Sequence, residues 1–228
     1  MSLFESSPDK PTNVSESIAA SLREEIMSGR LAPGSPVRQE RVAEQFGASR
    51  LPVREALRIL TSQGFLTKRT NAGARVAVLD LRACVVIYSI REAIEPIAFT
   101  ESVNNLNQAA IDRLEAIQDQ IEAGVSIEEY LSLDREFHLT TYSGGTMDYI
   151  QGLVSNLWDI TDHYRRLFVK LADPSKDWRI NIEHRLIIDS IKRKNSHEGG
   201  QVIATHIGRT RDELSRHPEL FAPVTENE

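Results

Sequence analysis

The hydrophobic pattern changes near residue 80, and this change limits the possible folds more than any other feature of the sequence. From about residue 82 to residue 216, apolar residues recur at the helical spacing of three and four, with few prolines and no alternation typical of a strand. Before residue 80 the elements are short and are separated by turn residues. The sequence therefore predicts two parts, the second built from helices alone.

The first part has the pattern of a small domain in which helices precede a hairpin. A helix is expected over residues 14–29, and two shorter helices over 38–47 and 50–63 are closed by glycines. The segment FLTKRTNAGARVAVL holds two β-prone runs around Asn71-Ala72-Gly73, which is typical of a hairpin. A helix, a helix-turn-helix and a hairpin in this order predict a winged helix-turn-helix over residues 13–80.

The second part, residues 81–217, is predicted to be an all-α antiparallel bundle of six or seven helices. The expected segments are about 82–103, 107–123, 127–142, 147–171, 174–194 and 199–216. The fold class is thus mostly α. Residues 1–12, rich in Ser, Pro and Asp, are expected to be a disordered leader, and residues 218–228 a tail.

Composition narrows the class of protein. The N-terminus lacks the basic start and apolar core of a signal peptide, and the run ACVVIY is far too short to span a membrane. The lone Cys84 excludes an internal disulfide, so we expect a cytoplasmic protein without a membrane partner. Residues 1–80 carry 11 Lys and Arg against 9 Asp and Glu, and the remainder carries 16 against 24. A polyanion would therefore meet only the first part.

The segment ASRLPVREALRIL, residues 48–60, predicts a helix that reads double-stranded DNA. Ser49 stands at or just before the N-cap, and Pro52 lies in the first turn, where its missing N–H costs nothing. Arg50 and Arg54 project from the first turns, and arginine binds guanine edges or phosphates through two N–H groups. The alternative is a solvated face on which the arginines pair with neighbours such as Glu55.

The segments GRLAPG and VAEQFGASRLPVREAL, with the glycine of the hairpin, resemble the DNA-binding domain of GntR-type bacterial transcription regulators. The resemblance covers nearly the whole first part. It implies DNA contacts from six residues: Arg38, Ser49, Arg50, Pro52, Arg54 and Gly73. Arg69 and Arg75 flank the hairpin, as a wing that follows the DNA backbone requires. Glu40 departs from the pattern, since some members carry a DNA-binding arginine there.

Three predicted helices of the second part each place polar residues on an apolar row. Asp134 and His138 continue a row with Ile127 and Leu131, and the other two rows contain His184 and His206. A buried carboxylate is costly unless it is paired or binds a metal. One Asp and three His suit a divalent transition metal. Alternatively, each histidine is a hydrogen-bonded core residue.

The second part also resembles the FCD ligand-binding domain of the FadR-like branch of these regulators, through IREAIEP, the DREFH segment and EHRLIIDSI. In metal-containing members the ligands are one Asp and three His, which implies Asp134, His138, His184 and His206. Zn or Ni is expected first, with Mn and Fe as further candidates. Arg91, on an apolar row, and Asn156, on the row of Tyr149 and Ile160, are expected to bind a small organic acid. Glu95 is the alternative partner of Arg91.

These features together predict a regulator, and not an enzyme: a homodimeric repressor that binds a palindromic operator and responds to a small carboxylate. Two alternatives remain. In a metal-sensing regulator the metal itself is the signal. In a metal-dependent hydrolase the metal activates water, but no inward carboxylate is placed as a general base, and Glu183 is expected to point away from His184.

Overall fold

The computed structural model describes residues 14–69, 73–78, 80–172 and 177–221, and it divides the chain into two units between Val78 and Leu79. Each unit is described by itself. The predicted leader, the Asn71-Ala72 tip of the hairpin and residues 222–228 of the predicted tail lie outside the described residues. Among the described residues, no helix is both long and apolar enough to cross a membrane.

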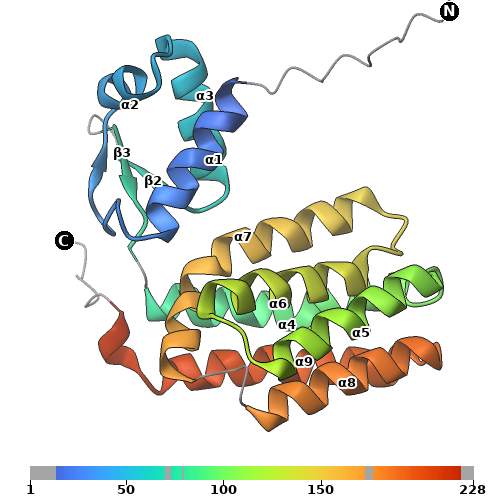
Figure 1. Ribbon diagram of the computed structural model, residues 1–228. Helices are drawn as coiled ribbons and strands as arrows, with labels where there is room; N and C mark the ends of the chain where they lie inside the picture. Colours follow the sequence, from blue (N-terminus) through green and yellow to red (C-terminus); the bar gives the residue numbers. More distant parts are fainter. Residues whose placement is uncertain (1–13, 70–72, 79, 173–176, 222–228) are drawn as a thin grey trace, which may run out of the picture. The chain divides into compact units, whose positions relative to one another are not determined.

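The first unit combines three helices with a small antiparallel sheet (Figure 1). Its elements are α1 (Val14–Met27), β1 (Pro36–Val37), α2 (Gln39–Phe46), α3 (Arg50–Ser62), β2 (Leu66–Arg69) and β3 (Gly73–Val76). The strand order is β1-β3-β2, with Arg69 paired to Gly73 at the hairpin. Strand β1 was not predicted, because two residues are too few to show an alternating pattern.

The helix-turn-helix is held by one tight turn and one shared core. Gly47 has φ 56° and closes α2, its N–H bonding to the carbonyls of Ala43 and Glu44, and this left-handed backbone suits glycine. Helix α3 then packs on α1 through the fully buried Val53 and Leu60. Because its apolar side is buried against α1 and the sheet, the polar side of α3 faces solvent.

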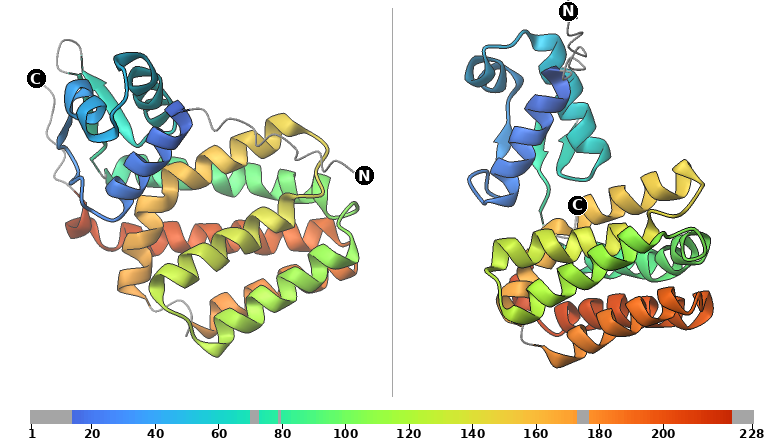
Figure 2. Two further views of the ribbon diagram at one scale, coloured as in Figure 1. Left: turned by 45° about the horizontal axis from the view of Figure 1, so that its top comes forward. Right: turned by 45° about the vertical axis from the view of Figure 1, so that its right-hand side comes forward.

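The second unit is a bundle of six α-helices among the described residues, followed by a short 3-10 turn. The elements are α4 (Leu81–Ser102), α5 (Gln108–Ala123), α6 (Ile127–Tyr142), α7 (Asp148–Leu171), α8 (Trp178–Lys192), α9 (Ser196–Ser215) and η1 (Pro218–Leu220). Helices α4 and α9 run antiparallel, side by side (Figures 1 and 2). Helix α4 also packs on α6 and α7, whereas α5 packs on α6 and α8. The mostly helical prediction is confirmed.

Side-chain caps set the start of most of these helices. Asp80, Asn107, Ser126, Asp177 and Asn195 each accept a hydrogen bond from a backbone N–H in the first turn that follows. The Asp177 cap starts α8 at Trp178, although the sequence predicted a start near residue 174. The Asn195 cap likewise starts α9 at Ser196, ahead of the predicted residue 199.

Gly199 lies inside α9 because no side chain fits there. A Cβ at this position would overlap the Phe99 ring of α4 and the Ser190 hydroxyl of α8. We expect Gly199→Ala to destabilise the fold by about 1–2 kcal/mol, since overpacking outweighs the gain in helix propensity. A methyl group at Gly152 in α7 would have no described atom within 4 Å, so Gly152→Ala should stabilise the fold slightly. Urea unfolding of both variants tests this, and effects of the same sign would contradict it.

Candidate functional site

One polar cluster lies inside the helical bundle, where α6, α8 and α9 face one another. It contains the four predicted metal ligands: Asp134, His138, His184 and His206. One potential ligand atom from each residue lies within 4.8 Å of the others. All four side chains are buried, with His184 fully inaccessible. The predicted rows therefore do converge, which is the arrangement that a metal site requires.

The charge of Asp134 is balanced by an arginine that the sequence analysis missed. Arg165 of α7 donates from Nη2 to Asp134 Oδ2 at 2.6 Å, and both side chains are buried. Burial alone would raise the pKa of Asp134, but the Arg165 guanidinium holds that pKa well below its usual range. Tyr130 donates to Oδ1 at 3.3 Å. Asp134 is thus an ionised carboxylate whose Oδ1 faces the histidines.

Two of the histidines are oriented by polar side chains behind them. Gln118 Oε1 of α5 lies 2.7 Å from His184 Nδ1, and Glu183 Oε2 lies 2.9 Å from His206 Nδ1. Both partners accept, so each Nδ1 carries the proton and each Nε2 keeps its lone pair. Such outer partners typically orient metal-ligating histidines. Glu183, expected to point away from the site, thus supports it through the histidine of the neighbouring helix.

The histidines are neutral. Burial lowers the pKa of His184 to about 3 and lowers the pKa of His138 and of His206 as well. Neutral imidazole is the form that binds a metal. His184 Nε2 and both ring nitrogens of His138 are buried without a hydrogen-bond partner among the described residues. Asp134 Oδ1 lies 3.7 Å from His184 Nε2 and 3.8 Å from His138 Nε2. The donor set and its orphaned nitrogens fit a divalent ion.

A cavity of about 30 Å³ adjoins the cluster and is lined by Asp134, His138, His206, Arg91 and Arg165, among others. Its volume holds a water molecule or an ion. A larger ligand would have to displace side chains from its wall.

Arg91 lines this cavity and is also paired, as the alternative interpretation held. Its Nε lies 2.5 Å from Glu95 Oε1 and its Nη1 donates to Thr161 at 3.0 Å. Its guanidinium lies over the Trp158 ring, 4.2 Å from the centroid. Glu95 is fully buried and also accepts from Tyr142 and Trp158. Arg91 is therefore held rigidly at the wall.

The prediction that Asn156 lies on an inward-facing row of α7 with Tyr149 and Ile160 is wrong. Tyr149 is 79% exposed, and Asn156 is half-buried and does not line the cavity. The buried row includes Trp158, Thr161 and Arg165 instead. Apolar residues occur on more than one side of α7, so periodicity did not distinguish adjacent rows. The signal that was missed is an arginine, Arg165, two turns after Trp158 on the same side of α7.

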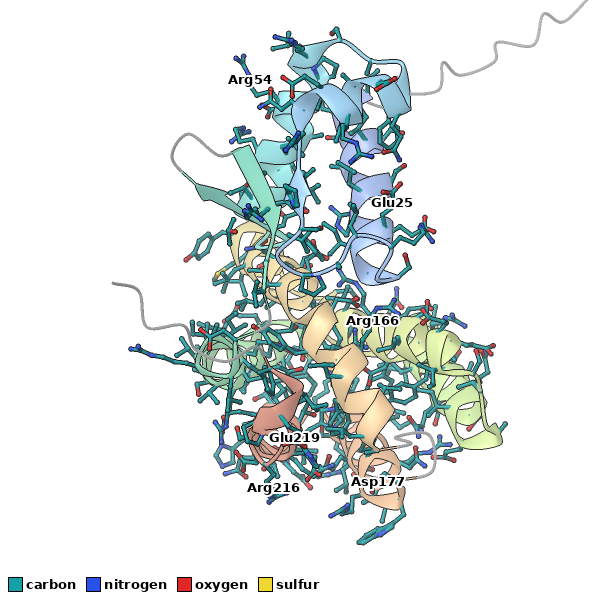
Figure 3. All side chains as sticks on the ribbon, turned by 90° about the vertical axis from the view of Figure 1, so that its left-hand side faces the viewer. Glu25, Arg54, Arg166, Asp177, Arg216 and Glu219 are labelled. Atoms are coloured by element: carbon teal, nitrogen blue, oxygen red, sulfur yellow. The ribbon has the colours of Figure 1, made fainter. Side chains whose placement is uncertain are left out.

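A second candidate site lies on the first unit, at the start of α3. Arg54 is exposed and forms no ion pair among the described residues, and Figure 3 shows it pointing outward. Arg50 is 78% exposed and reaches Glu40 only at 3.9 Å. Arg58, by contrast, pairs with Glu55 at 2.7 Å. The alternative of paired surface arginines thus holds for Arg58, while the two predicted DNA-contacting arginines are left available.

The other residues predicted to contact DNA also belong to the first unit. Ser49 is the N-cap of α3, but its hydroxyl makes no capping hydrogen bond. Arg38 is exposed at the N-cap of α2, Pro52 lies in the first turn of α3, and Gly73 begins β3. Arg75 was expected to follow DNA, but its Nη1 donates to the Gly34 carbonyl at 2.8 Å. That side chain therefore joins β3 to the preceding turn.

Comparisons with known protein families match both units. Residues 14–76 match the family described as "Bacterial regulatory proteins, gntR family", and residues 86–209 match the FCD domain.

Individual relatives span nearly the same length. A Bacillus subtilis protein described as an uncharacterized HTH-type transcriptional regulator, YdhC, is 25% identical and aligns over 90% of this chain and 93% of its own. The Bacillus subtilis gluconate operon transcriptional repressor is 30% identical over 78% of this chain and 75% of its own. Among solved structures, Escherichia coli McbR/YncC has a TM-score of 0.74 at 22% identity, covering 90% of this chain and 98% of that one. The last likeness shows the fold.

Two arginine–aspartate pairs join α6 to α7, and their burial differs. Arg165 and Asp134 are 6% and 8% exposed, whereas Arg135 and Asp159 are 29% and 20% exposed. In protein treated with a chelator, Arg165→Met should cost about 3–5 kcal/mol of unfolding free energy, because it leaves a buried carboxylate without its cation. Arg135→Met should cost less than about 1 kcal/mol. Denaturant unfolding measures both, and equal losses would contradict this assignment.

Proposed function

Because this chain belongs to the gntR family of bacterial regulatory proteins and carries an FCD domain, we propose that it is a repressor controlled by a small carboxylate bound at a metal centre. The conclusion that the chain regulates transcription does not depend on which ligand it binds. The chain is a DNA-binding transcription regulator, since its relatives are regulators and not enzymes. The metal, the effector, the homodimer and the sign of regulation are the proposal.

The observation that carries the proposal is the electrostatic balance of the buried cluster. Its single carboxylate, Asp134, is already neutralised by Arg165, and its three histidines are neutral. The nearby Arg91 is likewise neutralised by Glu95. A divalent ion would therefore add positive charge that no protein group offsets. Excess charge in a buried site is costly, so an anionic ligand would stabilise the loaded centre.

The residues that would hold the metal are Asp134 through Oδ1, His184 and His206 through Nε2, and His138. Zn or Ni suits this imidazole-rich set best, with Mn and Fe as further candidates. When bound, the ion would supply a Lewis-acidic position for an oxygen ligand. Gln118 and Glu183 would keep two imidazoles in the correct tautomer, and Arg165 would keep Asp134 ionised.

The small cavity suggests how an effector would act on the protein. A space of about 30 Å³ does not admit an organic acid, so binding requires the lining side chains to move. Arg91 is the side chain best suited to receive the carboxylate, because its planar group bonds two oxygens at once. Its release from Thr161 would remove a contact between α4 and α7. An effector shifts DNA binding only by its differential affinity for the two states.

The first unit would bind the operator with α3 in the major groove. Arg50 and Arg54 would contact bases or phosphates, and Ser49, with its free hydroxyl, a phosphate. Arg38, Pro52 and Gly73 complete the proposed contact set. One such unit reads a half-site, so a palindromic operator and a homodimer are part of the proposal.

Arg54 is the residue chosen to test the proposed DNA contacts. We expect Arg54→Ala to raise the Kd about tenfold or more and to reduce its salt dependence, because one charged contact is lost. Fluorescence anisotropy would measure binding to a duplex that the wild-type chain has enriched from a random pool. Arg58→Ala, one turn further along α3 and already paired with Glu55, is the matched control. Equal losses in the two variants would reject the assignment.

Metal content is tested by elemental analysis before and after chelation. We expect about one transition metal ion per chain, and a strong reduction in Asp134→Ala. Gln118→Leu should weaken metal affinity about 10–100-fold, because the His184 ring loses its orienting partner. The control is Gln108→Leu on the same helix. It removes only an exposed contact with Asp112, so it should leave the metal affinity unchanged.

The effector is tested in the same preparations. A mixture of small organic acids should raise the unfolding temperature of the metal-loaded chain and release it from DNA, and chelation should abolish both effects. If metal alone, without an organic acid, released the chain from DNA, the chain would instead be a metal sensor. If no metal copurifies and added Zn or Ni leaves stability unchanged, the histidines are core residues and the carboxylate proposal fails.

A further inference from the structure

Tyr88 of α4 ends in a buried hydroxyl group to which no described residue is hydrogen-bonded. Its side chain is 1% exposed, and its oxygen has no hydrogen-bond partner in the described part of the chain. The other three buried tyrosines each donate to an acceptor within the chain: Tyr130 to Asp134, Tyr142 to Glu95, and Tyr164 to the Asp80 carbonyl. An unpaired buried hydroxyl is costly, so that of Tyr88 requires an explanation.

Tyr88 lines the small cavity beside the candidate metal ligands, together with Arg91 and Arg165. Arg91 follows it by three residues, on the same side of α4, and its guanidinium lies 5.3 Å from the centroid of the Tyr88 ring. Arg165 also ends in a buried group without a hydrogen bond among the described residues, since its Nη1 lies 3.7 Å from Asp162 Oδ1. Two donors without hydrogen bonds thus belong to the wall at which the effector is proposed to bind.

The chemistry of this wall favours an oxygen acceptor. Burial raises the pKa of Tyr88, so the phenol keeps its proton and can donate a hydrogen bond. Arg91 and Arg165 both line the cavity, and their positive charges would repel an ammonium group. Arg165 is already neutralised by Asp134 at 2.6 Å, so a second carboxylate would find no unmatched charge beside it. A hydroxyl or carbonyl oxygen is therefore the group that suits these donors best.

We propose that Tyr88 is the residue by which the site selects its effector, because its hydroxyl donates to an oxygen that the acid carries in addition to its carboxylate. The preferred ligand is then a small hydroxy or oxo acid, and Arg165 Nη1 offers a second donor. This inference rests on the proposed function, which supplies the carboxylate near Arg91. An acid without the extra oxygen would fill the cavity and leave the phenol unpaired.

The selection is tested by isothermal titration of the Zn-loaded chain with matched acids. Propionate, lactate and pyruvate share one carboxylate and differ in the oxygen on the second carbon, whereas malonate has a second carboxylate instead. Each is used together with its four- to six-carbon homologues. We expect the hydroxy or oxo acids to bind about 10–100-fold more tightly than the matched acids without that oxygen, because they alone pair the phenol.

Tyr88→Phe separates the contribution of the phenol from that of the metal, which can also bind the extra oxygen. The variant removes the hydroxyl and keeps the ring. The ratio of hydroxy-acid affinity to plain-acid affinity should fall about tenfold in Tyr88→Phe. It should stay unchanged in the control Tyr164→Phe, because the Tyr164 hydroxyl bonds the Asp80 carbonyl and Tyr164 does not line the cavity. An unchanged ratio in Tyr88→Phe, or equal weakening of both acids, would overturn the assignment.

A second measurement requires neither metal nor acid. Tyr88→Phe should lower the unfolding temperature less than Tyr142→Phe, because the Tyr142 hydroxyl bonds Glu95 at 2.7 Å and the Tyr88 hydroxyl bonds no described residue. The reverse order would show that the Tyr88 hydroxyl is structural and would overturn its role in selection.

The titrations also distinguish failure of this inference from failure of the proposed function. If none of the acids binds the Zn-loaded wild-type chain at millimolar concentration, the carboxylate effector fails, and the role of Tyr88 fails with it. If acids bind but their order of affinity does not depend on Tyr88, the carboxylate effector stands and only the role of Tyr88 is rejected.

Discussion

The ion pair between Arg165 and Asp134 is the interaction on which the rest of the bundle interior depends. A buried carboxylate without a cation would either take up a proton or destabilise the fold. With Arg165 at 2.6 Å, Asp134 stays ionised and buried, and three histidines can surround it as neutral groups. Arg165 also lies over Trp158, 4.5 Å from the ring centroid, on the face of α7 that packs toward α4 and α6. One pair thus links charge balance with helix packing.

The same balance makes the cluster suitable for a switch. Asp134 is paired with Arg165, and Arg91 is paired with Glu95. A neutral, closely packed interior has few ways to accommodate an added charge without rearrangement. Under the proposed function such a site would respond to ion and anion together, and the response would pass to α4, which carries Arg91 and Glu95. Because α4 follows directly on the DNA-binding unit in the chain, it is well placed to couple the two functions.

Much of the fold and part of the site could be predicted from local patterns. The period of 3.6 predicted six helical segments of the second unit, and the helix-turn-helix with its hairpin was clear from turn residues. The His184 row lies on the buried face as predicted, together with Ile180, Ile187 and Ile191. The α7 row could not be assigned in this way, since Tyr149 and Trp158 both follow apolar periodicity and only packing distinguishes them. Similarly, nothing local distinguished Arg75, tied to Gly34, from an arginine facing solvent.

The sequence by itself determined the order of elements, the ligand-type residues on α6, α8 and α9, and the exposed arginines of α3, because each depends on spacing within one helix or turn. Tertiary structure alone decided which residues from different helices meet. Gln118 reaches His184, Glu183 reaches His206, and Arg165 reaches Asp134, each from a neighbouring helix. These contacts depend on how helices are rotated and placed against one another. Helical periodicity records which side of a helix is apolar, but it carries no information about the partner that covers that side.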